Sequence, residues 1–263
     1  MPETSDAFLD RALDVARGAA LAAGELIARH FARGVQVEIK ADDTPVTIAD
    51  REAEDTIRHL LGRAFPDHAI LGEERGRTGT SEFLWLVDPL DGTKSFVRGM
   101  PFFSTQIALM HRGELVLGVS HACVYGETMW ARRGGGAFLD GKRVHVADTR
   151  ELRDAVLSLG NIKSLTKNGR RWNALGALIR EVNRVRGYGD FAHYHLLARG
   201  ALDIVIESDV NILDIAALAV IVREAGGIFT DLQGAEPTLE TTSVLAAATA
   251  ELHSEVRRRL LET

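Results

Sequence analysis

The chain has little of what marks a secreted, membrane-spanning or nucleic-acid-binding protein. It carries a single cysteine, Cys123, in 263 residues, so no internal disulfide can form and we expect a reducing compartment. No apolar run approaches the roughly 18 residues that a transmembrane helix needs, and no basic segment precedes an apolar one at the N-terminus. The net charge of −6 gives no general attraction to nucleic acid or an anionic membrane. We therefore expect a cytoplasmic protein with neither partner.

The composition and the hydrophobic pattern predict one layered domain over residues 1–263. Hydrophobic residues make up 46% of the chain and charged residues 26%, as in ordinary soluble proteins. The spacing of apolar residues predicts helices at about 6–31, 47–65, 172–182, 190–198, 213–225 and 251–261. Short apolar or alternating runs predict strands at 35–39, 69–71, 83–87, 104–110, 115–122, 128–131, 202–206 and 244–247, with a turn at 42–45. Because strands cluster in the middle, we expect mixed sheets rather than a plain Rossmann domain.

Two carboxylates follow the most apolar of these strands. Residues 83–87 are apolar without a break and predict a strand buried on both faces. Because Pro89 cannot donate to a sheet ladder, we expect the strand to end there. Asp88 and Asp91 then lie at its carboxyl end, which is the edge where open α/β sheets bind ligands.

The residues after Asp91 predict an anion site beside these acids. Gly92 and Thr93 can turn the chain and begin a helix, whose free N–H groups favour phosphate. Carboxylates next to a phosphate repel it unless a cation lies between them. Carboxylate oxygens suit a hard divalent cation. The stretch therefore predicts Mg²⁺ and a phosphate group held together.

Further acids fall near predicted turns, and each has an ordinary interpretation by itself. Asp50 fits a capping box, Glu73 fits a solvated loop, and Asp214 fits the N-cap of the helix that follows it. Asp88 and Asp91 could equally be a turn and a cap. Taken together, these acids favour one shared metal site. They follow predicted strands or begin predicted buried helices, and they lie near glycine or proline turns.

These segments resemble the inositol monophosphatase-like family of Mg²⁺-dependent phosphatases. The matching motifs are Leu71-Gly-Glu-Glu74, Trp85-Leu-Val-Asp-Pro-Leu-Asp-Gly-Thr93, and Leu213-Asp-Ile-Ala-Ala217 with Glu224-Ala-Gly-Gly227. The resemblance extends from the N-terminal helix to the C-terminus and implies an α/β sandwich with alternating α-β-α-β-α layers. The family commonly has tryptophan where this chain has Leu213, so the pocket wall differs there.

The resemblance implies two metal sites with a shared ligand. Glu73, Asp88 and the backbone carbonyl of Leu90 would hold the first ion. Asp88 would bridge to a second ion, which Asp91 and Asp214 would also bind. Two such cations can stabilise the attacking and leaving oxygens of a phosphoryl transfer together.

The resemblance also implies the catalytic and phosphate-binding residues. Glu73 and Thr93, supported by Asp50, would position and activate the attacking water. The backbone N–H groups of Gly92 and Thr93 would bind the phosphate. Phosphoryl transfer then needs mainly positioning and charge neutralisation.

The substrate is indicated by a second resemblance, to the branch that hydrolyses L-histidinol phosphate in histidine biosynthesis. It rests on residues 44–51, 94–101, 186–194 and 202–207. Asp190 stands where inositol phosphatases of the family usually carry a small residue. Its carboxylate can pair with the protonated amine of histidinol, and Glu207 would add a second acceptor. The alternative is that Asp190 only caps the helix that it begins.

Other functions stay open beside the histidinol-phosphate phosphatase that these residues favour. The first is an inositol-1-phosphate or broad sugar-phosphate phosphatase. The second is a non-catalytic protein that binds metal or phosphate, although the intact set of acids argues against it. The family resemblance further suggests a homodimer. We interpret His193 and His195 as structural, since residues two apart on a helix do not share a face.

Overall fold

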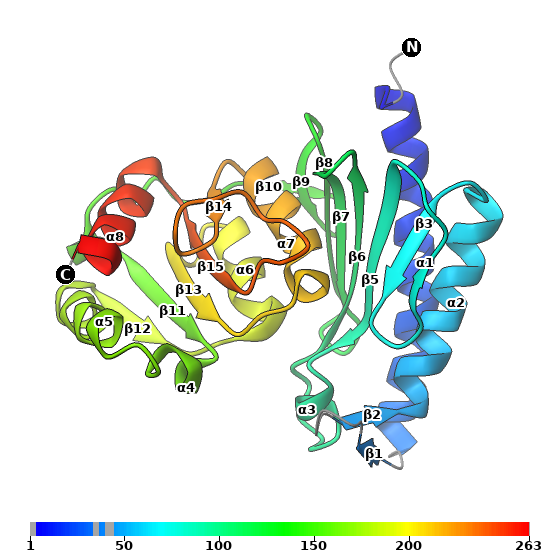
Figure 1. The fold of residues 1–263 in the computed structure, drawn as a ribbon, viewed down its shortest axis with the longest axis horizontal. Helices are drawn as coiled ribbons and strands as arrows, with labels where there is room; N and C mark the ends of the chain where they lie inside the picture. The colour runs from blue at the N-terminus through cyan, green and yellow to red at the C-terminus, as the bar shows by residue number, and fades with distance from the viewer. Residues whose placement is uncertain (1–3, 34–36, 40–44, 263) are drawn as a thin grey trace. The chain divides into compact units, whose positions relative to one another are not determined.

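The computed structural model describes residues 4–33, 37–39 and 45–262, and the chain divides into two compact units (Figure 1). The first unit holds residues 1–142 and 213–221, and the second holds residues 143–212 and 222–263. The expectation of one domain over residues 1–263 stays a prediction. Most of the expected turn at 42–45 lies outside the described residues, as do the first two residues of the strand expected at 35–39.

An eight-stranded mixed sheet forms the centre of the first unit (Figure 1). Its strand order is β10-β9-β8-β7-β6-β5-β3-β4; β3 and β5 pair in parallel, and β5 to β9 are joined by antiparallel pairings. The strands are β3 (Ala69–Gly72), β4 (Gly76–Thr78), β5 (Phe83–Asp91), β6 (Ser104–His111), β7 (Glu114–Ala122), β8 (Glu127–Arg132), β9 (Gly136–Leu139) and β10 (Lys142–Val144). A separate antiparallel pair joins β1 (Val37–Ile39) to β2 (Pro45–Thr47).

Two long helices cover one face of this sheet. They are α1 (Asp6–Arg33) and α2 (Ile48–Ala64), as the apolar spacing predicted. The buried side of α1 is rich in alanine, which lets it pack closely against α2 and the sheet. Trp85, Val87, Ile107 and Leu109 on β5 and β6 complete this core. The face that these residues occupy is therefore apolar, and alternate residues of the same strands point to the other face.

The opposite face of the sheet receives part of α7 (Ile212–Glu224), whose residues 213–221 belong to the first unit. The contact is close at Gly118 on β7, where an added Cβ would lie 2.3 Å from the carbonyl oxygen of Ala217. Leu117 and Val119 on either side of Gly118 face the α1 core. The missing side chain at 118 therefore lets α7 lie directly on the sheet.

The central strand continues past the point where we expected it to end. β5 runs to Asp91 and includes Pro89, so the prediction that the strand stops at the proline is wrong. The register between β5 and β6 shifts between Asp88 and Asp91, which removes Pro89 and Leu90 from the ladder. Proline is tolerated at such a bulge because its missing N–H breaks no ladder bond. The short helix α3 (Thr93–Phe96) then begins after Gly92, as predicted.

A five-stranded sheet forms the centre of the second unit. Its order is β12-β11-β13-β15-β14, with β11 parallel to β12 and β13, and β15 antiparallel to β13 and β14. The strands are β11 (Val156–Gly160), β12 (Arg184–Arg186), β13 (Ile204–Ser208), β14 (Ile228–Thr230) and β15 (Ser243–Ala247). The helices α5 (Gly169–Glu181) and α8 (Ala250–Glu262) pack with the Leu157 and Leu159 face, while α6 (Asp190–Ala198) contacts the Ser158 face. Two short helices, α4 (Ile162–Leu165) and η1 (Leu152–Asp154), complete the unit.

The predicted elements differ from the observed ones mainly at their ends. The helix expected from 172 begins at Gly169, because Asn168 caps it by accepting a hydrogen bond from Arg171 N–H at 3.0 Å. The strand expected from 202 begins at Ile204. The three-residue strands β4, β12 and β14 lie at or next to sheet edges and were not predicted. In the described part of the chain, none of the helices combines the length and the hydropathy that a bilayer crossing requires.

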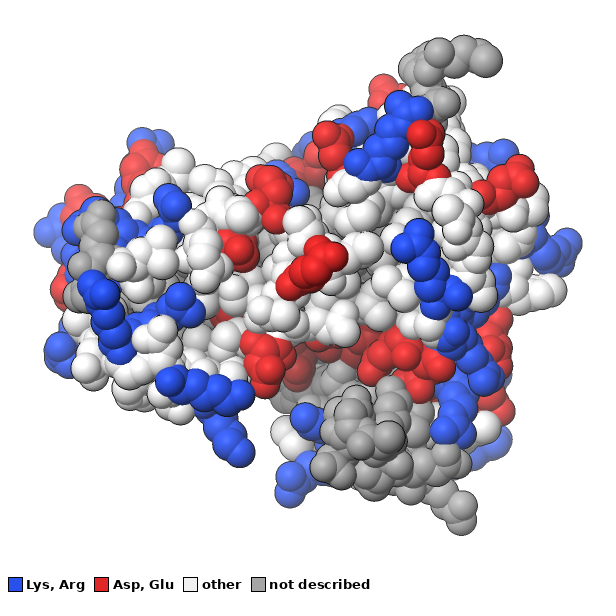
Figure 2. Space-filling view, in the orientation of Figure 1, with Lys and Arg blue, Asp and Glu red and all other residues white. Residues whose placement is uncertain are grey.

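Charged side chains are interspersed over the face of the molecule drawn in Figure 2. In the first unit, Arg132 on β8 pairs with Asp10 on α1 at 2.5 Å, and Arg75 pairs with Asp55 on α2 at 2.7 Å. Such exposed pairs contribute only about 0.2–1 kcal/mol each. The fold therefore depends mainly on the two apolar cores.

Candidate metal centre

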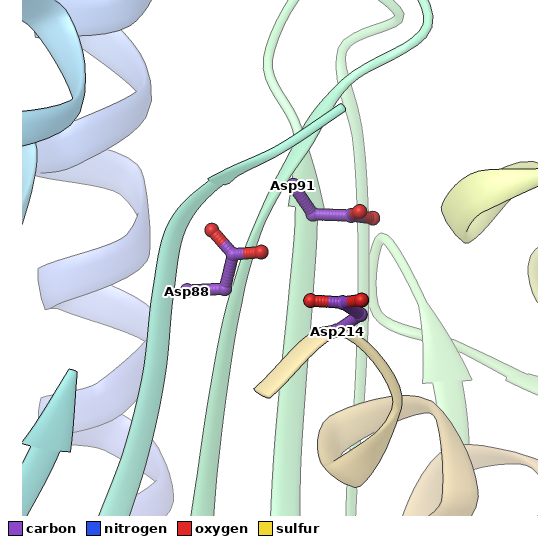
Figure 3. Close-up of side chains that lie close together, drawn as sticks. All are labelled: Asp88, Asp91 and Asp214. Atoms are coloured by element: carbon purple, nitrogen blue, oxygen red, sulfur yellow. The ribbon is translucent and has the colours of Figure 1, made fainter. Parts of the chain in front are cut away.

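Three aspartates that are far apart in the sequence meet in the first unit. One carboxylate oxygen from each of Asp88, Asp91 and Asp214 lies within 4.8 Å of the others, and Figure 3 shows the side chains pointing toward one another. Asp88 and Asp91 flank the bulge of β5, and Asp214 lies in the first turn of α7. Because α7 begins at Ile212, Asp214 is inside the helix and is not its N-cap. Three oxygen ligands at this separation suit a hard divalent cation.

Glu73 lies beside this cluster on the turn that follows β3. Its backbone N–H donates to the carbonyl oxygen of Val87 at 3.2 Å, which holds the turn against β5. Its carboxyl group lies close enough to Asp88 to raise the pKa of that buried carboxyl group. Glu73 is exposed, whereas Asp88 is almost fully buried. The fold thus brings together the three aspartates that the sequence predicted as metal ligands and places Glu73 next to one of them, Asp88.

A buried carboxylate that the sequence reasoning missed fixes the turn carrying Glu73. Glu54 on α2 is fully buried and accepts hydrogen bonds from the backbone N–H groups of Glu74 at 2.6 Å and Arg75 at 3.1 Å. Arg58, one helical turn later, donates to the same carboxylate at 2.6 Å. The sequence signal for Glu54 was its place beside Ala53 and Ile57, which belong to the buried side of the helix. A charged residue on a buried side needs hydrogen-bond partners, so its presence there indicates a structural role.

Asp50, Thr93 and Leu90 form a connected hydrogen-bond network. Thr47 caps α2 in a capping box, and its N–H and hydroxyl both donate to Asp50 Oδ2, at 2.7 and 2.6 Å. The other oxygen, Oδ1, lies 3.0 Å from the Thr93 hydroxyl, which is also 3.0 Å from the carbonyl oxygen of Leu90. The predicted capping box is confirmed, and its aspartate also reaches the predicted catalytic threonine.

Asp91 and Asp88 are held by neighbours as well. Ser104 Oγ lies 3.4 Å from Asp91 Oδ2, and Gln106 Nε2 donates to Ser104 Oγ at 2.8 Å. The N–H of Leu90 donates to Asp88 Oδ1 at 2.9 Å. These contacts orient both carboxylates before any ligand arrives. The run of three polar residues, 104–106, at the start of β6 was the sequence signal for the contacts to Asp91.

The electrostatics of the centre favour a bound cation. The pKa of Asp88 is raised well above its ordinary value, first by burial and then by the negative charges of Glu73, Asp91 and Asp214. The pKa of Asp50 is also raised, mainly by burial, although hydrogen bonds from Thr47 and Thr93 act in the opposite direction. A divalent cation would remove the mutual repulsion among the acids, which adds to the effect of burial on Asp88. The residues present therefore fit a metal ion.

The backbone at Gly92 and Thr93 offers donors beside the acids. Gly92 has φ +94°, and among the described residues neither its N–H nor that of Thr93 donates a hydrogen bond to the protein. Free backbone N–H groups next to a cation can bind an anionic oxygen, such as that of a phosphate group.

The two residues expected to select the substrate belong to the second unit. Asp190 is half-buried and is the first residue of α6, with Gly189 in the N-cap position, so Asp190 is not the cap of this helix. Glu207 ends the buried part of β13 and is itself buried. His193 contacts Glu207 at 3.1 Å and is fully buried in this network.

Comparison with known proteins identifies the family. Residues 9–262 match the inositol monophosphatase family. The chain belongs to this family. It is 43% identical to a histidinol-phosphatase of Mycobacterium tuberculosis over 88% of this chain and 90% of that protein, and 38% identical to an inositol-1-monophosphatase of Mesorhizobium japonicum over 89% and 90%. The crystal structure of the extragenic suppressor protein suhB from Bartonella henselae matches with a TM-score of 0.87 and 33% identity, covering 95% of this chain and 98% of that one.

Family membership confirms the predicted fold class and the predicted enzyme. The chain has the inositol monophosphatase fold, an α/β sandwich of mixed sheets flanked by helices. It is a phosphomonoester hydrolase of a family that is generally metal-dependent. The comparisons thus favour the enzyme over the non-catalytic alternative.

Proposed function

We propose that this phosphatase hydrolyses L-histidinol phosphate with Mg²⁺ as its cofactor. The observation that carries the metal-dependent reaction is the convergence of Asp88, Asp91 and Asp214 within 4.8 Å, beside Glu73. The 43% identity to a histidinol-phosphatase and the acid at position 190 support the substrate. Inositol-1-phosphate is the second candidate, because a relative of 38% identity is an inositol-1-monophosphatase.

The acidic side chains would hold the cation, with Glu73, Asp88 and the Leu90 carbonyl on one side and Asp91 and Asp214 on the other. Bound there, Mg²⁺ supplies charge neutralisation for the phosphoryl group and a nucleophile that is available near neutral pH. The burial of Asp88 and the hydrogen bond from Leu90 N–H hold that carboxylate in place before binding. Preorganised ligands avoid a reorganisation cost during the reaction.

The remaining residues orient the reactants. The amides of Gly92 and Thr93 bind the phosphate oxygens, which places the phosphorus next to the acids. Asp50 accepts the Thr93 hydroxyl hydrogen at 3.0 Å, so the threonine oxygen is left as an acceptor for a proton of the attacking water. Glu73, which is open to solvent, accepts the water's other proton as it attacks. The ester oxygen leaves on the opposite side of the phosphorus and takes up a proton from solvent, which gives the alcohol.

Asp88→Asn tests the metal centre. The variant should lower kcat roughly 1,000-fold or more, because it removes several kcal/mol of charge stabilisation. Without metal it should be no less heat-stable than the wild type, since it also removes repulsion among the acids. Asp67→Asn, at an exposed aspartate of the same unit, is the matched control and should keep full activity. An active Asp88→Asn enzyme would contradict the metal-site assignment.

Asp190→Ala tests the substrate. Losing a charge-assisted contact to the amine should lower kcat/KM for histidinol phosphate by roughly tenfold, while kcat/KM for inositol 1-phosphate changes little. Asp154→Ala, at an exposed aspartate of the second unit, should change neither value. If the wild type prefers inositol 1-phosphate, or if Asp190→Ala keeps the preference for histidinol phosphate, the substrate proposal fails.

We also propose a homodimer in the cytoplasm. Met100, Val124 and Tyr125 of the first unit are large apolar residues that are each more than 40% exposed, and Phe102 packs edge-on against Tyr125. Exposed large apolar side chains of this kind are typical of an association surface. Cys123 is a free, half-buried thiol, and burial raises its pKa to about 11, which suits an unreactive cysteine in a reducing compartment. Light scattering of the purified protein measures its mass, and a monomer at all concentrations would contradict the dimer.

A further inference from the structure

The carboxylate of Glu207 is held on one oxygen only. The Tyr194 hydroxyl donates to Oε2 at 2.8 Å, and His193 Nε2 lies 3.1 Å from the same oxygen. All three side chains are buried, with exposed fractions of 4% or less. Because an ionised carboxylate has only acceptors, His193 Nε2 carries the hydrogen in this contact. Two donors on one oxygen fix the direction of the carboxylate plane.

Gly160 makes room for this carboxylate on the neighbouring strand. Gly160 on β11 is in register with Glu207 on β13. A Cβ added at Gly160 would lie 2.0 Å from Glu207 Oε1 and 2.4 Å from its Cδ. Any side chain at position 160 would therefore displace the carboxylate. The absence of one lets Glu207 lie across β11.

A second set of contacts holds the imidazole of His193. The backbone N–H of Tyr188 donates to Ser158 Oγ at 3.2 Å, and Ser158 Oγ lies 3.4 Å from His193 Nδ1. The ring is thus held at both nitrogens, between β11 and β13. Tyr188 lies two residues before Asp190, so the same network reaches the segment that carries the other predicted selectivity residue.

The second oxygen of Glu207 has no such donor. Among the described residues, none donates a hydrogen bond to Oε1. Oε1 is also absent from the set of polar side-chain atoms that are fully buried and lack a partner. A carboxylate oxygen in a largely buried position gains from a positively charged donor. The geometry therefore fixes one oxygen and leaves the other for a cationic ligand.

We infer that His193 and Tyr194 are positioning residues for substrate selection. They hold Oε2 of Glu207 so that Oε1 is the oxygen presented to a phosphomonoester whose alcohol carries a protonated amine. This inference rests on the proposed function, which gives Glu207 its contact with substrate. His193 thus has a role beyond the purely structural one expected from its spacing.

A double-mutant cycle on Tyr194 and Glu207 tests the inference. The readout is kcat/KM for histidinol phosphate divided by kcat/KM for glycerol 2-phosphate, which has no amine. Tyr194→Phe should lower this ratio roughly tenfold through KM, with kcat little changed, since a hydrogen bond to a charged group is lost. Glu207→Gln should lower it as well, and the double variant should fall no further than Glu207→Gln alone.

A matched set of histidine variants separates positioning from folding. His193→Gln keeps an N–H donor and should retain most of the ratio, whereas His193→Leu should lose it about as far as Tyr194→Phe. His59→Leu, at an exposed histidine of α2, should leave the ratio unchanged. Equal losses in His193→Gln and His193→Leu would overturn the inference.

The outcomes distinguish this inference from the proposed function. If the ratio falls in Glu207→Gln but not in Tyr194→Phe, the inference is overturned and the proposed function is not. The same holds if Tyr194→Phe lowers kcat/KM equally for both esters, or if its effect adds to that of Glu207→Gln. A ratio unaffected by Glu207→Gln overturns the proposed contact of Glu207 with substrate as well. Independently, ¹⁵N NMR of His193 should find Nε2 protonated, and an unprotonated Nε2 would also overturn the inference.

Discussion

Gly92 joins β5 to α3 at a backbone angle that residues with a side chain rarely adopt. Its φ is +94°, and a Cβ there would lie 2.5 Å from the carbonyl oxygen of Phe102. Gly92→Ala should therefore lower the free energy of unfolding by roughly 2 kcal/mol. It should also reduce kcat/KM, because the amides at 92 and 93 are the proposed phosphate donors. Urea unfolding and steady-state kinetics measure the two effects.

Gly113 provides the matched control for this substitution. It lies between β6 and β7 with φ +87°, and no atom lies within 4 Å of an added Cβ. Gly113→Ala should show the backbone strain alone, with a smaller loss of stability and unchanged kinetics. Equal kinetic losses in the two variants would mean that the amides at Gly92 have no special role.

At the residue level, the sequence predicted the acids better than their supports. Asp88, Asp91 and Asp214 occur in motifs that a family resemblance can match, so their meeting was expected and is observed. Glu54 and Gln106 lie outside those motifs. Their roles depend on which backbone N–H groups and hydroxyls fold next to them, and sequence spacing does not contain that information.

The N-terminus of α2 connects helix capping to catalysis. Thr47 caps the helix and binds Asp50 Oδ2, and Asp50 Oδ1 accepts the hydroxyl of Thr93. Thr47→Ala should lower the free energy of unfolding by about 1 kcal/mol, a typical loss for a removed cap. It should also lower kcat several-fold, because Asp50 and through it Thr93 are held less firmly. Thermal unfolding and kinetics on one preparation measure both.

The cap of α5 separates these two effects. Asn168 accepts a hydrogen bond from Arg171 N–H at 3.0 Å at the start of a helix in the second unit. Asn168→Ala should cost a similar free energy without lowering kcat. If both cap variants lowered kcat alike, reduced stability alone would explain the loss in Thr47→Ala.

At the level of elements, long periodic segments were predicted well and irregular ones were not. The apolar spacing of α1 and α2 gave both helices within two residues. The end of β5 was misjudged, because a proline ends a strand only where a ladder bond would be needed. The register shift between Asp88 and Asp91 removes that need, and it depends on β6, which lies further along the chain.

For the whole molecule, metal binding and pH should be linked. Burial and the neighbouring acids raise the pKa of Asp88 in the metal-free protein. A carboxyl group whose pKa is raised by folding contributes its full stabilisation when the pH is below its ordinary pKa of 3.8. This contribution is lost as the pH rises through the raised pKa of the folded state. Protons therefore compete with Mg²⁺, so calorimetry should find weaker Mg²⁺ binding at pH 5.5 than at pH 7.5.

The thermal shift that Mg²⁺ produces should follow the same trend. The increase in Tm on adding Mg²⁺ to metal-free protein should grow between pH 5.5 and 7.5, because the repulsion that the cation relieves grows with ionisation. Asp88→Asn should show little of this dependence. An equal Mg²⁺ affinity at both pH values in the wild type would contradict the idea that Asp88 titrates with the metal.

One consequence of the connectivity concerns the order in which the chain is made. The sheet of the first unit is encoded by residues up to 144, yet the third aspartate of the cluster, Asp214, is added only about seventy residues later, after most of the second unit's first segment. A nascent or truncated chain that stops before α7 has two of the three converging aspartates. Fragments that end before α7 should therefore lack phosphatase activity, so activity in the cell requires synthesis to have passed residue 214.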